Sequence, residues 1–327
     1  MSTSIVATAP GKVVLSGEYA VLDCAPAICM AINYRARATI SVRVDGFSRV
    51  ESKGYVSERG EFQSTDSGIR WQIGRKSFIV IDTVWQAVNI GKDTGRDIHL
   101  DTTSFIDSLT LQKIGVGSSA AISVALTAAV MGCADIATIG MLAHKAHKEL
   151  QGGIGSGVDI ATSLQGGLIE YRVEDNAVKI LSWPNGLSYR LIWTGTPAIT
   201  RDKLAQLNMG VSKPSRVRLA DASESMACHW QSGDPVRVLN GYRDYCEQLR
   251  EFSDDYKLGI FDMGHDELWR EAKARNLIYK PCGAGGGDVG ILLGLDNVEL
   301  DAFCHSLSNN FKILDCELSD VGVRIEL

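Results

Sequence analysis

A glycine-rich turn followed by two hydroxyl residues lies near the middle of the chain. It reads Lys113-Ile114-Gly115-Val116-Gly117-Ser118-Ser119-Ala120-Ala121, and the apolar stretch that follows has the composition of a helix. Glycines let the backbone curl with its amides inward, and a helix start adds unpaired N–H groups and a positive dipole end. The corner is therefore predicted to bind an anion, with Ser118 and Ser119 available to cap the helix, bond a phosphate or hold Mg²⁺. A plain glycine turn with a serine N-cap would have the same sequence.

Two further glycine turns and one lysine complete the set of candidate residues. Residues 152–157 open into an expected helix with Asp159 near its start, and residues 283–287 precede Asp288 and an expected strand. Lys12 follows Pro10 and Gly11 in an expected turn between two strands. Taken singly, Lys12 could be an exposed turn lysine and Asp159 a carboxylate favoured by the helix dipole. Neither the dinucleotide fingerprint nor the P-loop pattern is present.

Composition excludes several classes of function. The 327 residues have room for two ordinary domains, and 45% apolar with 22% charged residues is typical of a globular protein. A net charge of -6 offers no basic surface for nucleic acid. The most apolar window, residues 115–133, is too rich in glycine and serine for a membrane span, and no signal peptide is evident. Eight cysteines without a Cys-x-x-Cys pair favour a reducing, cytoplasmic setting.

Hydrophobic periodicity predicts a mixed α+β chain. The polar residues 51–70 are expected to form a hairpin or a surface loop, and the Pro-Asn-Gly region before residue 187 is the best boundary, giving domains 1–187 and 188–327. Strands are expected at 5–15 (as two strands about the Pro-Gly turn), 37–44, 97–103, 166–171, 188–193, 289–293 and 321–327. Helices are expected at 78–90, 118–130, 136–150, 158–163 and 298–309, with two or three more between 203 and 275.

The order and spacing of these motifs resemble the GHMP kinase superfamily. Residues 10–19, 115–121 and 283–288 look like its first, second and third motifs. Within the superfamily the chain is most similar to bacterial-type phosphomevalonate kinases, in Gly17-Glu18-Tyr19, in Lys113, and in residues 155–159, 193–198 and 281–290. It departs from that branch at Cys282, where Ser is usual, and at Ile199, where a small hydroxyl residue is frequent. His147 stands where mevalonate kinases have a metal-binding glutamate, so no Glu ligand is transferred; Glu149 is nearby.

The resemblance implies a role for each candidate residue. Lys12 and Asp159 are the expected catalytic pair, and Ser119 is the expected metal ligand. Lys113 and Arg201 could instead pair with an acceptor phosphate, or be ordinary surface charges. The expected nucleotide-binding residues are Lys113, Gly115, Val116, Gly117, Ser118, Ser119 and Ala120. The expected substrate-binding residues are Glu18, Tyr19, Ser156, Gly283, Ala284 and Gly285. His144 and His147 share a helix face but lack a third ligand, so they are expected to lie on the helix surface or behind the site.

The resemblance also implies a fold and a reaction. We expect a two-domain GHMP kinase-like fold, with an N-terminal ribosomal protein S5 domain 2-like half, a C-terminal ferredoxin-like half, and the active site between them. The expected reaction uses ATP and Mg²⁺ to convert 5-phosphomevalonate into 5-diphosphomevalonate. The alternatives are a mevalonate kinase or other small-alcohol kinase, and an inactive nucleotide-binding regulator on the same fold. Expected partners are the small-molecule substrate and, as an option, a second copy in a homodimer, but neither nucleic acid nor a membrane.

Overall fold

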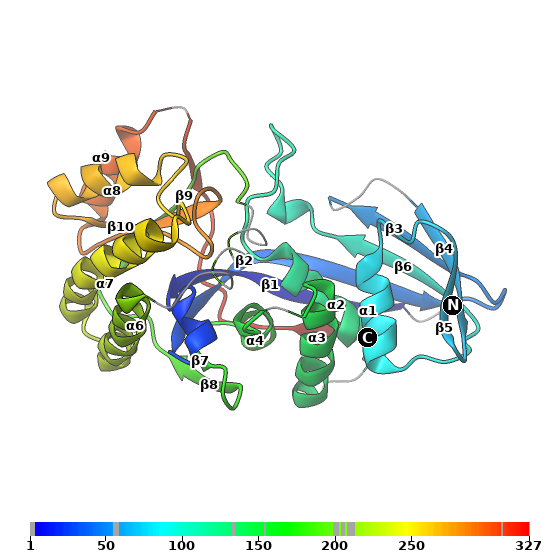
Figure 1. Cartoon of the computed structure of the whole chain (residues 1–327). Coiled ribbons are helices and arrows are strands. Elements are labelled where there is room, and N and C mark those ends of the chain that lie inside the picture. Colours follow the sequence, from blue (N-terminus) through cyan, green and yellow to red (C-terminus); the bar gives the residue numbers. More distant parts are fainter. Residues whose placement is uncertain are drawn as a thin grey trace.

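The computed structural model describes residues 4–54, 59–132, 135–153, 155–198, 203, 207, 213–308 and 310–326. Within these ranges the chain forms two lobes, each built on its own β-sheet with helices against it (Figure 1). The α+β prediction is confirmed. Arg201 and Ile199, which the sequence singled out, lie outside the described residues.

Nine described strands form the sheet of the first lobe. Along its main path the order is β13-β1-β2-β6-β3-β4-β5, and β7 pairs with β2 and with β8. Their bounds are β1 Ser4–Ser16, β2 Ala27–Val42, β3 Ser48–Lys53, β4 Arg59–Thr65, β5 Gly68–Ile73, β6 Arg96–Asp101, β7 Leu168–Arg172, β8 Ala177–Leu181 and β13 Arg324–Glu326. The long antiparallel pair β1 and β2 is the centre of the molecule, because it extends from this lobe toward the second (Figure 1).

Strand β1 corrects one expectation. The sequence predicted a turn at Pro10 and Gly11, but β1 is a single strand whose register against β2 shifts between these two residues. Proline has no N–H for the ladder, so a bulge is where a strand tolerates it. Gly11 is required because a Cβ there would lie 2.6 Å from the Val116 carbonyl oxygen. Lys12 therefore projects from a strand at a bulge, which holds it more firmly than a turn would.

Four helices cover one face of the first sheet: α1 (Ile79–Val88), α2 (Ser118–Met131), α3 (Ile136–Leu150) and α4 (Val158–Gln165). All were predicted from the sequence. Helix α2 contacts β1, β2, α3 and α4, and every residue from Ala120 to Ala129 is buried. A helix surrounded on all sides has no need of a polar stripe, which explains its small and uniformly apolar composition. Two 3₁₀ turns, η1 (Ala20–Asp23) and η2 (Thr103–Phe105), join these elements.

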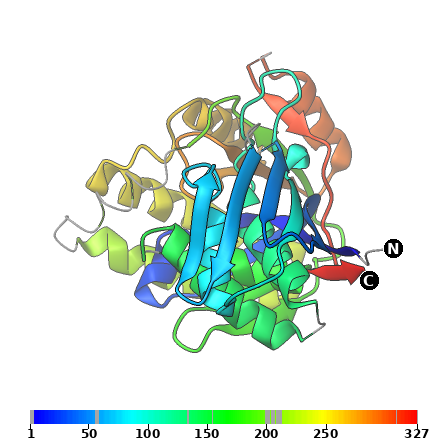
Figure 2. The same cartoon turned by 90° about the vertical axis from the view of Figure 1, so that its right-hand side faces the viewer.

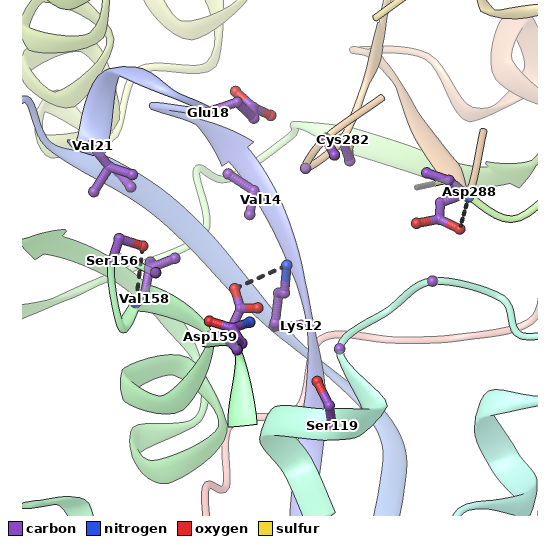
Figure 3. A pocket seen from close by; sticks show the side chains of 18 of the residues that line it. Lys12, Val14, Glu18, Val21, Ser119, Ser156, Val158, Asp159, Cys282 and Asp288 are labelled. Carbon is purple, nitrogen blue, oxygen red and sulfur yellow. Dashed lines mark hydrogen bonds and ion pairs between the residues drawn. The ribbon is translucent and has the colours of Figure 1, made fainter. Parts of the chain in front are cut away.

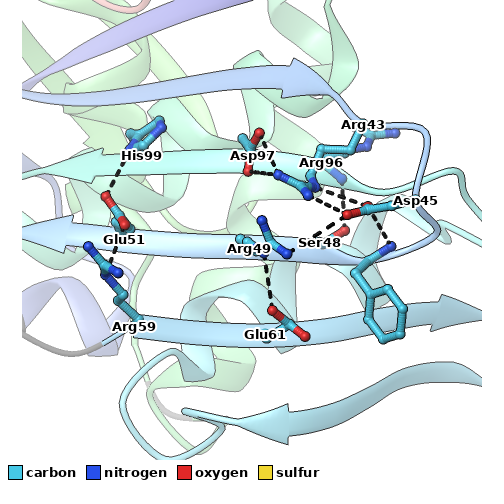
Figure 4. A network of polar contacts seen from close by, with 11 residues as sticks. Arg43, Asp45, Ser48, Arg49, Glu51, Arg59, Glu61, Arg96, Asp97 and His99 are labelled. Atoms are coloured by element: carbon cyan, nitrogen blue, oxygen red, sulfur yellow. Dashed lines mark hydrogen bonds and ion pairs between the residues drawn. The ribbon is translucent and has the colours of Figure 1, made fainter.

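The opposite face of strands β2, β6, β3 and β4 is charged (Figure 4). Arg43 pairs with Asp97 at 2.8 Å and Arg49 with Glu61 at 3.1 Å, while the alternate residues, such as Val50, face the core. This alternation is what period-two patterning predicts for a sheet covered on one side. Exposed ion pairs of this kind contribute about 0–1 kcal/mol each, so this solvent-facing side of the sheet adds little to the stability of the fold.

The second lobe contains a four-stranded antiparallel sheet of order β10-β11-β9-β12. Its elements are β9 Ser188–Trp193, α6 Pro214–Ser232, α7 Pro235–Tyr256, α8 His265–Ala274, β10 Ile278–Pro281, β11 Val289–Gly294, α9 Asn297–His305 and β12 Lys312–Leu314. The sequence of strand, helices, two strands, helix and strand is the ferredoxin-like arrangement. The short strands β10 and β12 were not predicted, because each is too brief to show a period.

The end of the chain returns to the first lobe. Strand β13 pairs with β1, Leu318 bridges to Ile32, and the Arg35 guanidinium donates to the Gly322 carbonyl oxygen at 2.6 Å. Figure 2 shows strand β13, in red, beside the blue strand β1 at this edge. The division at residue 187 stays a prediction, and the chain after Leu318 hydrogen-bonds to the first lobe, through Ser319 to Ala31 and through Val323 to Leu164. No helix among the described residues is long and apolar enough to cross a membrane.

Candidate active site

A cavity of about 440 Å³ lies where the two lobes meet (Figure 3). Its first-lobe walls come from β1, the 113–119 loop and the start of α4, and its second-lobe wall comes from the 282–288 loop. The cavity is lined by these predicted site residues: Lys12, Glu18, Tyr19, Lys113, Gly115, Gly117, Ser118, Ser119, Ser156, Asp159, Gly283 and Ala284. The three glycine-rich turns of the sequence, at residues 115–119, 152–157 and 283–287, therefore meet at this cavity.

Three predicted residues do not line the cavity. Val116 and Ala120 are buried beneath the loop and contribute to its packing. Gly285 is buried as well, since a Cβ there would lie 2.5 Å from Ile260, and its carbonyl oxygen accepts from Lys203 Nζ at 2.7 Å. These three residues pack beneath the two loops and support their shape. Residue type alone could not distinguish this role from direct contact with a ligand.

The 115–119 loop has the geometry of an anion cradle. Gly115 and Gly117 have φ values of 89° and 85°, in the left-handed region that favours glycine. The N-cap of α2 is Gly117 and no side chain caps the helix, so the serine N-cap alternative is wrong. The backbone N–H of Lys12 donates to the Val116 carbonyl oxygen at 2.9 Å, which fastens the loop to β1. Ser118 and Ser119 are thus the first two residues of α2, and both line the cavity beside the unpaired amides of the first helical turn.

Lys12 and Asp159 form an ion pair at the centre of the cavity (Figure 3). The distance from Lys12 Nζ to Asp159 Oδ1 is 3.0 Å, with the side chains 12% and 26% exposed. Burial, the largest influence, would lower the pKa of Lys12, but the nearby Asp159 carboxylate outweighs it and the pKa is raised. The ammonium therefore stays charged at neutral pH, where it can attract an anion.

His147 is buried in the cavity wall. Its Nε2 lies 3.2 Å from Ser119 Oγ, and its side chain is almost fully enclosed. Burial lowers its pKa, so the imidazole is neutral at pH 7. Of the two expected positions, surface or behind the site, His147 occupies the second. His144 lies beside Gly157, where a Cβ would approach its ring to 2.2 Å.

The donor set fits Mg²⁺ bound together with a nucleotide, but not Mg²⁺ alone. Among the described residues, no group of three or more His, Cys, Asp or Glu side chains could hold a metal ion. Mg²⁺ prefers oxygen ligands and usually keeps waters while sharing substrate phosphates with one or two protein groups. The Ser119 hydroxyl supplies such an oxygen, and the Asp159 carboxylate faces the same cavity. His147 stands at the position that the sequence analysis matched to a metal-binding glutamate of mevalonate kinases, and it offers a ring nitrogen in place of a carboxylate oxygen.

Asp288 is a cavity residue that the sequence did not single out for a role. Its carboxylate accepts from the Ala198 N–H at 2.9 Å and packs against Gly115, where a Cβ would lie 2.0 Å from Asp288 Cγ. Burial raises its pKa to about 6, although Lys12 and Lys203 oppose the shift. The only sequence signal was its place at the end of the third glycine turn. Its contact with Gly115 joins the loops of the two lobes.

One end of the cavity is apolar, a feature that the sequence analysis missed. The lining there is aliphatic and includes Val14, Val21, Leu22, Ala27 and Val158. Two polar residues lie beside them: Glu18, and Ser156, whose hydroxyl accepts weakly from the Val158 N–H at 3.4 Å. Figure 3 shows Val14, Val21 and Val158 on the other side of Lys12 and Asp159 from Ser119, so we call that part the aliphatic half and the part around Lys12 the charged half.

The chain resembles known proteins both in its first half and along most of its length. The model for the GHMP kinases N terminal domain matches residues 81–167, which include the 113–119 loop and Asp159. The phosphomevalonate kinase of Streptomyces sp. (strain CL190) is 30% identical, with 89% of this chain and 90% of that protein aligned. The chain therefore belongs to the GHMP kinase family.

Within that family the chain is similar to phosphomevalonate kinases. A second relative with that name, from Saccharolobus solfataricus, is 29% identical over 89% of this chain and 91% of its own length. The human mevalonate kinase is 26% identical over 99% and 96%. In fold, the chain matches the Streptococcus pneumoniae phosphomevalonate kinase in complex with phosphomevalonate and AMPPNP, with a TM-score of 0.79 at 16% identity, over 96% of this chain and 99% of that one.

Proposed function

We propose that the protein transfers the γ-phosphoryl group of ATP to 5-phosphomevalonate, giving ADP and 5-diphosphomevalonate. The observation that supports this most is the convergence of an amide-lined loop, the Lys12 ammonium and the Asp159 carboxylate on one cavity. Phosphoryl transfer requires little more from a protein than alignment and neutralisation of charge. Relatives named phosphomevalonate kinase align along nine-tenths of the chain, which supports the same assignment.

Each group has a distinct part in the proposed reaction. The amides of residues 115–119 and the hydroxyls of Ser118 and Ser119 bind the β- and γ-phosphates at the positive end of α2. Bound Mg²⁺ would neutralise charge on those phosphates. Lys12 lies between the two anions and reduces their repulsion. A phosphate monoester has a second pKa of about 6, so the attacking oxygen is already mostly deprotonated and Asp159 chiefly aligns Lys12.

The aliphatic half of the cavity favours a branched-chain acceptor over a sugar. A sugar presents hydroxyls on every side, and each would lose its water against Val14, Val21 or Val158 without a replacement hydrogen bond. A short carbon chain with one methyl branch would instead gain from contact with these side chains. The charged half then receives the phosphorylated end of the acceptor.

A mevalonate kinase is the alternative on the same scaffold. An alcohol must lose its proton during transfer, and Asp159 is placed to accept it. Mevalonate kinases of 26–29% identity align over 98% or more of the chain in several cases, which favours keeping this alternative. An inactive regulator is disfavoured, because Lys12 and Asp159 are both present and paired.

The decisive experiment is an acceptor panel. Purified protein is incubated with ATP, Mg²⁺ and either 5-phosphomevalonate, mevalonate or galactose, and ADP release is followed together with the mass of the phosphorylated product. We expect turnover with 5-phosphomevalonate and at least tenfold lower kcat/KM with mevalonate. Preference for mevalonate would establish the alternative, and no turnover with any acceptor would favour the inactive regulator. Light scattering on the same sample tests whether the protein is a monomer or forms the homodimer considered above as an option.

A further inference from the structure

A buried ion pair joins the two lobes beside the cavity. Lys280, from β10 of the second lobe, donates to Glu18 Oε1 in the first lobe, and the side chains are 0% and 2% exposed. Burial alone would lower the pKa of Lys280, but the adjacent Glu18 carboxylate holds it above its ordinary value. A charge pair enclosed to this degree is stable only while both members are present and hydrogen-bonded.

Glu18 has no oxygen without a partner. Its second carboxylate oxygen, Oε2, accepts from the Tyr245 hydroxyl at 2.7 Å, and that hydroxyl accepts in turn from the Gly17 N–H at 2.8 Å. Tyr245 lies on α7 of the second lobe. The sequence suggested that Glu18 binds the acceptor, but the structure commits its carboxylate to Lys280 and Tyr245. Glu18 therefore affects a ligand indirectly, by fixing the position of the neighbouring backbone and side chains.

A second contact joins the same two parts of the chain. The Tyr19 hydroxyl donates to the Ala284 carbonyl oxygen at 2.7 Å, four residues beyond Lys280. Two corners are thus linked twice: the first-lobe corner, residues 17–19, and the second-lobe corner, residues 280–284. Both corners line the cavity, through Gly17, Glu18 and Tyr19 on one side and residues 282–284 on the other. Figure 3 shows Glu18 and Cys282 on these facing walls.

We propose that Glu18, Tyr19, Tyr245 and Lys280 form a two-point clamp that fixes the separation of the two corners and so positions the acceptor. This inference rests on the proposed function, since it treats the part of the cavity between the two corners as the acceptor site. Two links between the same corners prevent both sliding and rotation, whereas a single link would allow one to pivot on the other. The four side chains are positioning residues, and they act on the acceptor without taking part in phosphoryl transfer.

Two contacts between the lobes lie away from the cavity and differ from the clamp in this respect. The Tyr242 hydroxyl, also on α7, donates to the Leu15 carbonyl oxygen at 3.0 Å, and Arg216 pairs with Asp23 at 2.6 Å. Neither contact involves a residue that lines the cavity. These contacts join the lobes without setting the shape of the acceptor end, so Tyr242 provides a matched control for Tyr19.

The first test compares Tyr19→Phe with Tyr242→Phe, each of which removes one hydroxyl from one inter-lobe hydrogen bond. For Tyr19→Phe we expect the KM and the calorimetric Kd for 5-phosphomevalonate to rise about 5- to 20-fold, the equivalent of one hydrogen bond, with the KM for ATP within about 2-fold of wild type. The Ala284 carbonyl keeps a contact with Lys203 Nζ at 3.3 Å, so the melting temperature should change little. Tyr242→Phe should lower the melting temperature but leave both KM values unchanged.

The second test addresses the ion pair. Lys280→Met alone leaves an uncompensated buried carboxylate and is expected to fold poorly, so the informative variant is Glu18→Gln with Lys280→Met, which buries no charge. We expect this double variant to fold and still to show a raised acceptor KM, because a neutral pair holds the corners less firmly. Wild-type acceptor KM in both Tyr19→Phe and the double variant would overturn the clamp alone. Absence of acceptor turnover in the wild-type protein would overturn the proposed function and the clamp with it.

Discussion

At the scale of single residues, the resemblance to the GHMP kinase motifs predicted the charged centre of the site but not its surroundings. Lys12, Ser119 and Asp159 were predicted to converge, and they line one cavity. Asp288 could not be assigned, because its role depends on the packing of the second lobe against Gly115. Glu18 was recognised as a cavity residue, but its buried partner Lys280 carried no sequence signal, since a lysine in a short strand is usually exposed.

The first prediction at this scale concerns Asp159. Asp159→Asn removes the carboxylate that holds Lys12 at 3.0 Å, so the ammonium is no longer aligned with the transferred group. We expect kcat to fall by about 10²-fold, the cost of misplacing a positioned group, while the nucleotide still binds because the 115–119 loop is untouched. Steady-state kinetics and titration with a fluorescent ATP analogue measure the two effects. Asp23→Asn, which breaks an ion pair with Arg216 outside the cavity, should keep nearly full activity; unchanged turnover in Asp159→Asn would remove that residue from the mechanism.

The second prediction concerns the pH dependence of stability at Asp288. Its folded-state pKa, about 6, exceeds the ordinary value of about 3.9. Between these values the native state keeps a proton that the unfolded state has lost, so stability falls as pH rises through this window, and the loss is complete above pH 6. Asp288→Asn should therefore exceed wild type by about 1–3 kcal/mol at pH 7.5 and match it near pH 4. Urea unfolding at the two pH values measures this.

A control for that measurement is available on the charged sheet face. Arg43 holds the pKa of Asp45 down to about 2, so its carboxylate favours the folded state at neutral pH. Asp45→Asn should change stability at pH 7.5 in the opposite direction, toward destabilisation, and by a small amount because the pair is exposed. If Asp288→Asn were also destabilising at pH 7.5, the Ala198 N–H, Lys12 and Lys203 would outweigh the burial of the ionised carboxylate, and the predicted direction would be wrong.

At the scale of helices and strands, the long periodic segments were predictable and the special junctions were not. Helices α1, α2 and α3 follow from spacing and composition. The bulge at Pro10 and Gly11 was mistaken for a turn, because a Pro-Gly pair is a strong turn signal when only neighbours in sequence are considered. The deciding interaction is the close approach of Val116 to Gly11, which is a tertiary contact.

The prediction at this scale is that Gly115→Ala disrupts the contact between the two glycine loops. The new Cβ would meet Asp288 Cγ at 2.0 Å, so one loop must move. We expect a loss of about 1–3 kcal/mol in stability and at least tenfold weaker ATP binding, measured by thermal unfolding and calorimetry. Gly233→Ala is the matched control: it has a similar positive φ of 67° but no atom within 4 Å of the added Cβ, so it should lose some stability and no affinity.

Adding Asp288→Ala to Gly115→Ala provides a further check. Removing the Asp288 carboxyl makes room for the alanine methyl, so the double variant should recover part of the lost ATP affinity. No recovery would mean that the positive φ at Gly115, rather than the contact with Asp288, dominates the effect.

At the scale of the whole molecule, one hydrophobic core runs through both lobes. The largest cluster of buried side chains includes Leu15 and Tyr19 of the first lobe together with Tyr242 and Phe252 of the second, and the Tyr19 and Phe252 rings lie 5.5 Å apart. The sequence predicted two domains and an active site between them, but not this continuity, because the residues that join the lobes come from distant segments.

We therefore predict that the protein unfolds in a single cooperative transition. Trp71 and Trp85 report on the first lobe, and Trp193 and Trp269 on the second. Urea titrations of variants that keep tryptophan in one lobe only should give the same midpoint as far-UV circular dichroism. Two separated midpoints would show that the lobes unfold independently, in which case the shared core contributes little coupling.

The return of β13 to β1 has a consequence for synthesis on the ribosome. Residues 6–8 of β1 have no strand partner on this side until residues 324–326 have been made, so a nascent chain that ends before residue 324 presents an open strand edge there. Such edges are sites of aggregation in incomplete chains. Products of premature termination should therefore depend on chaperones far more than the finished protein does, even when they contain the entire catalytic cavity.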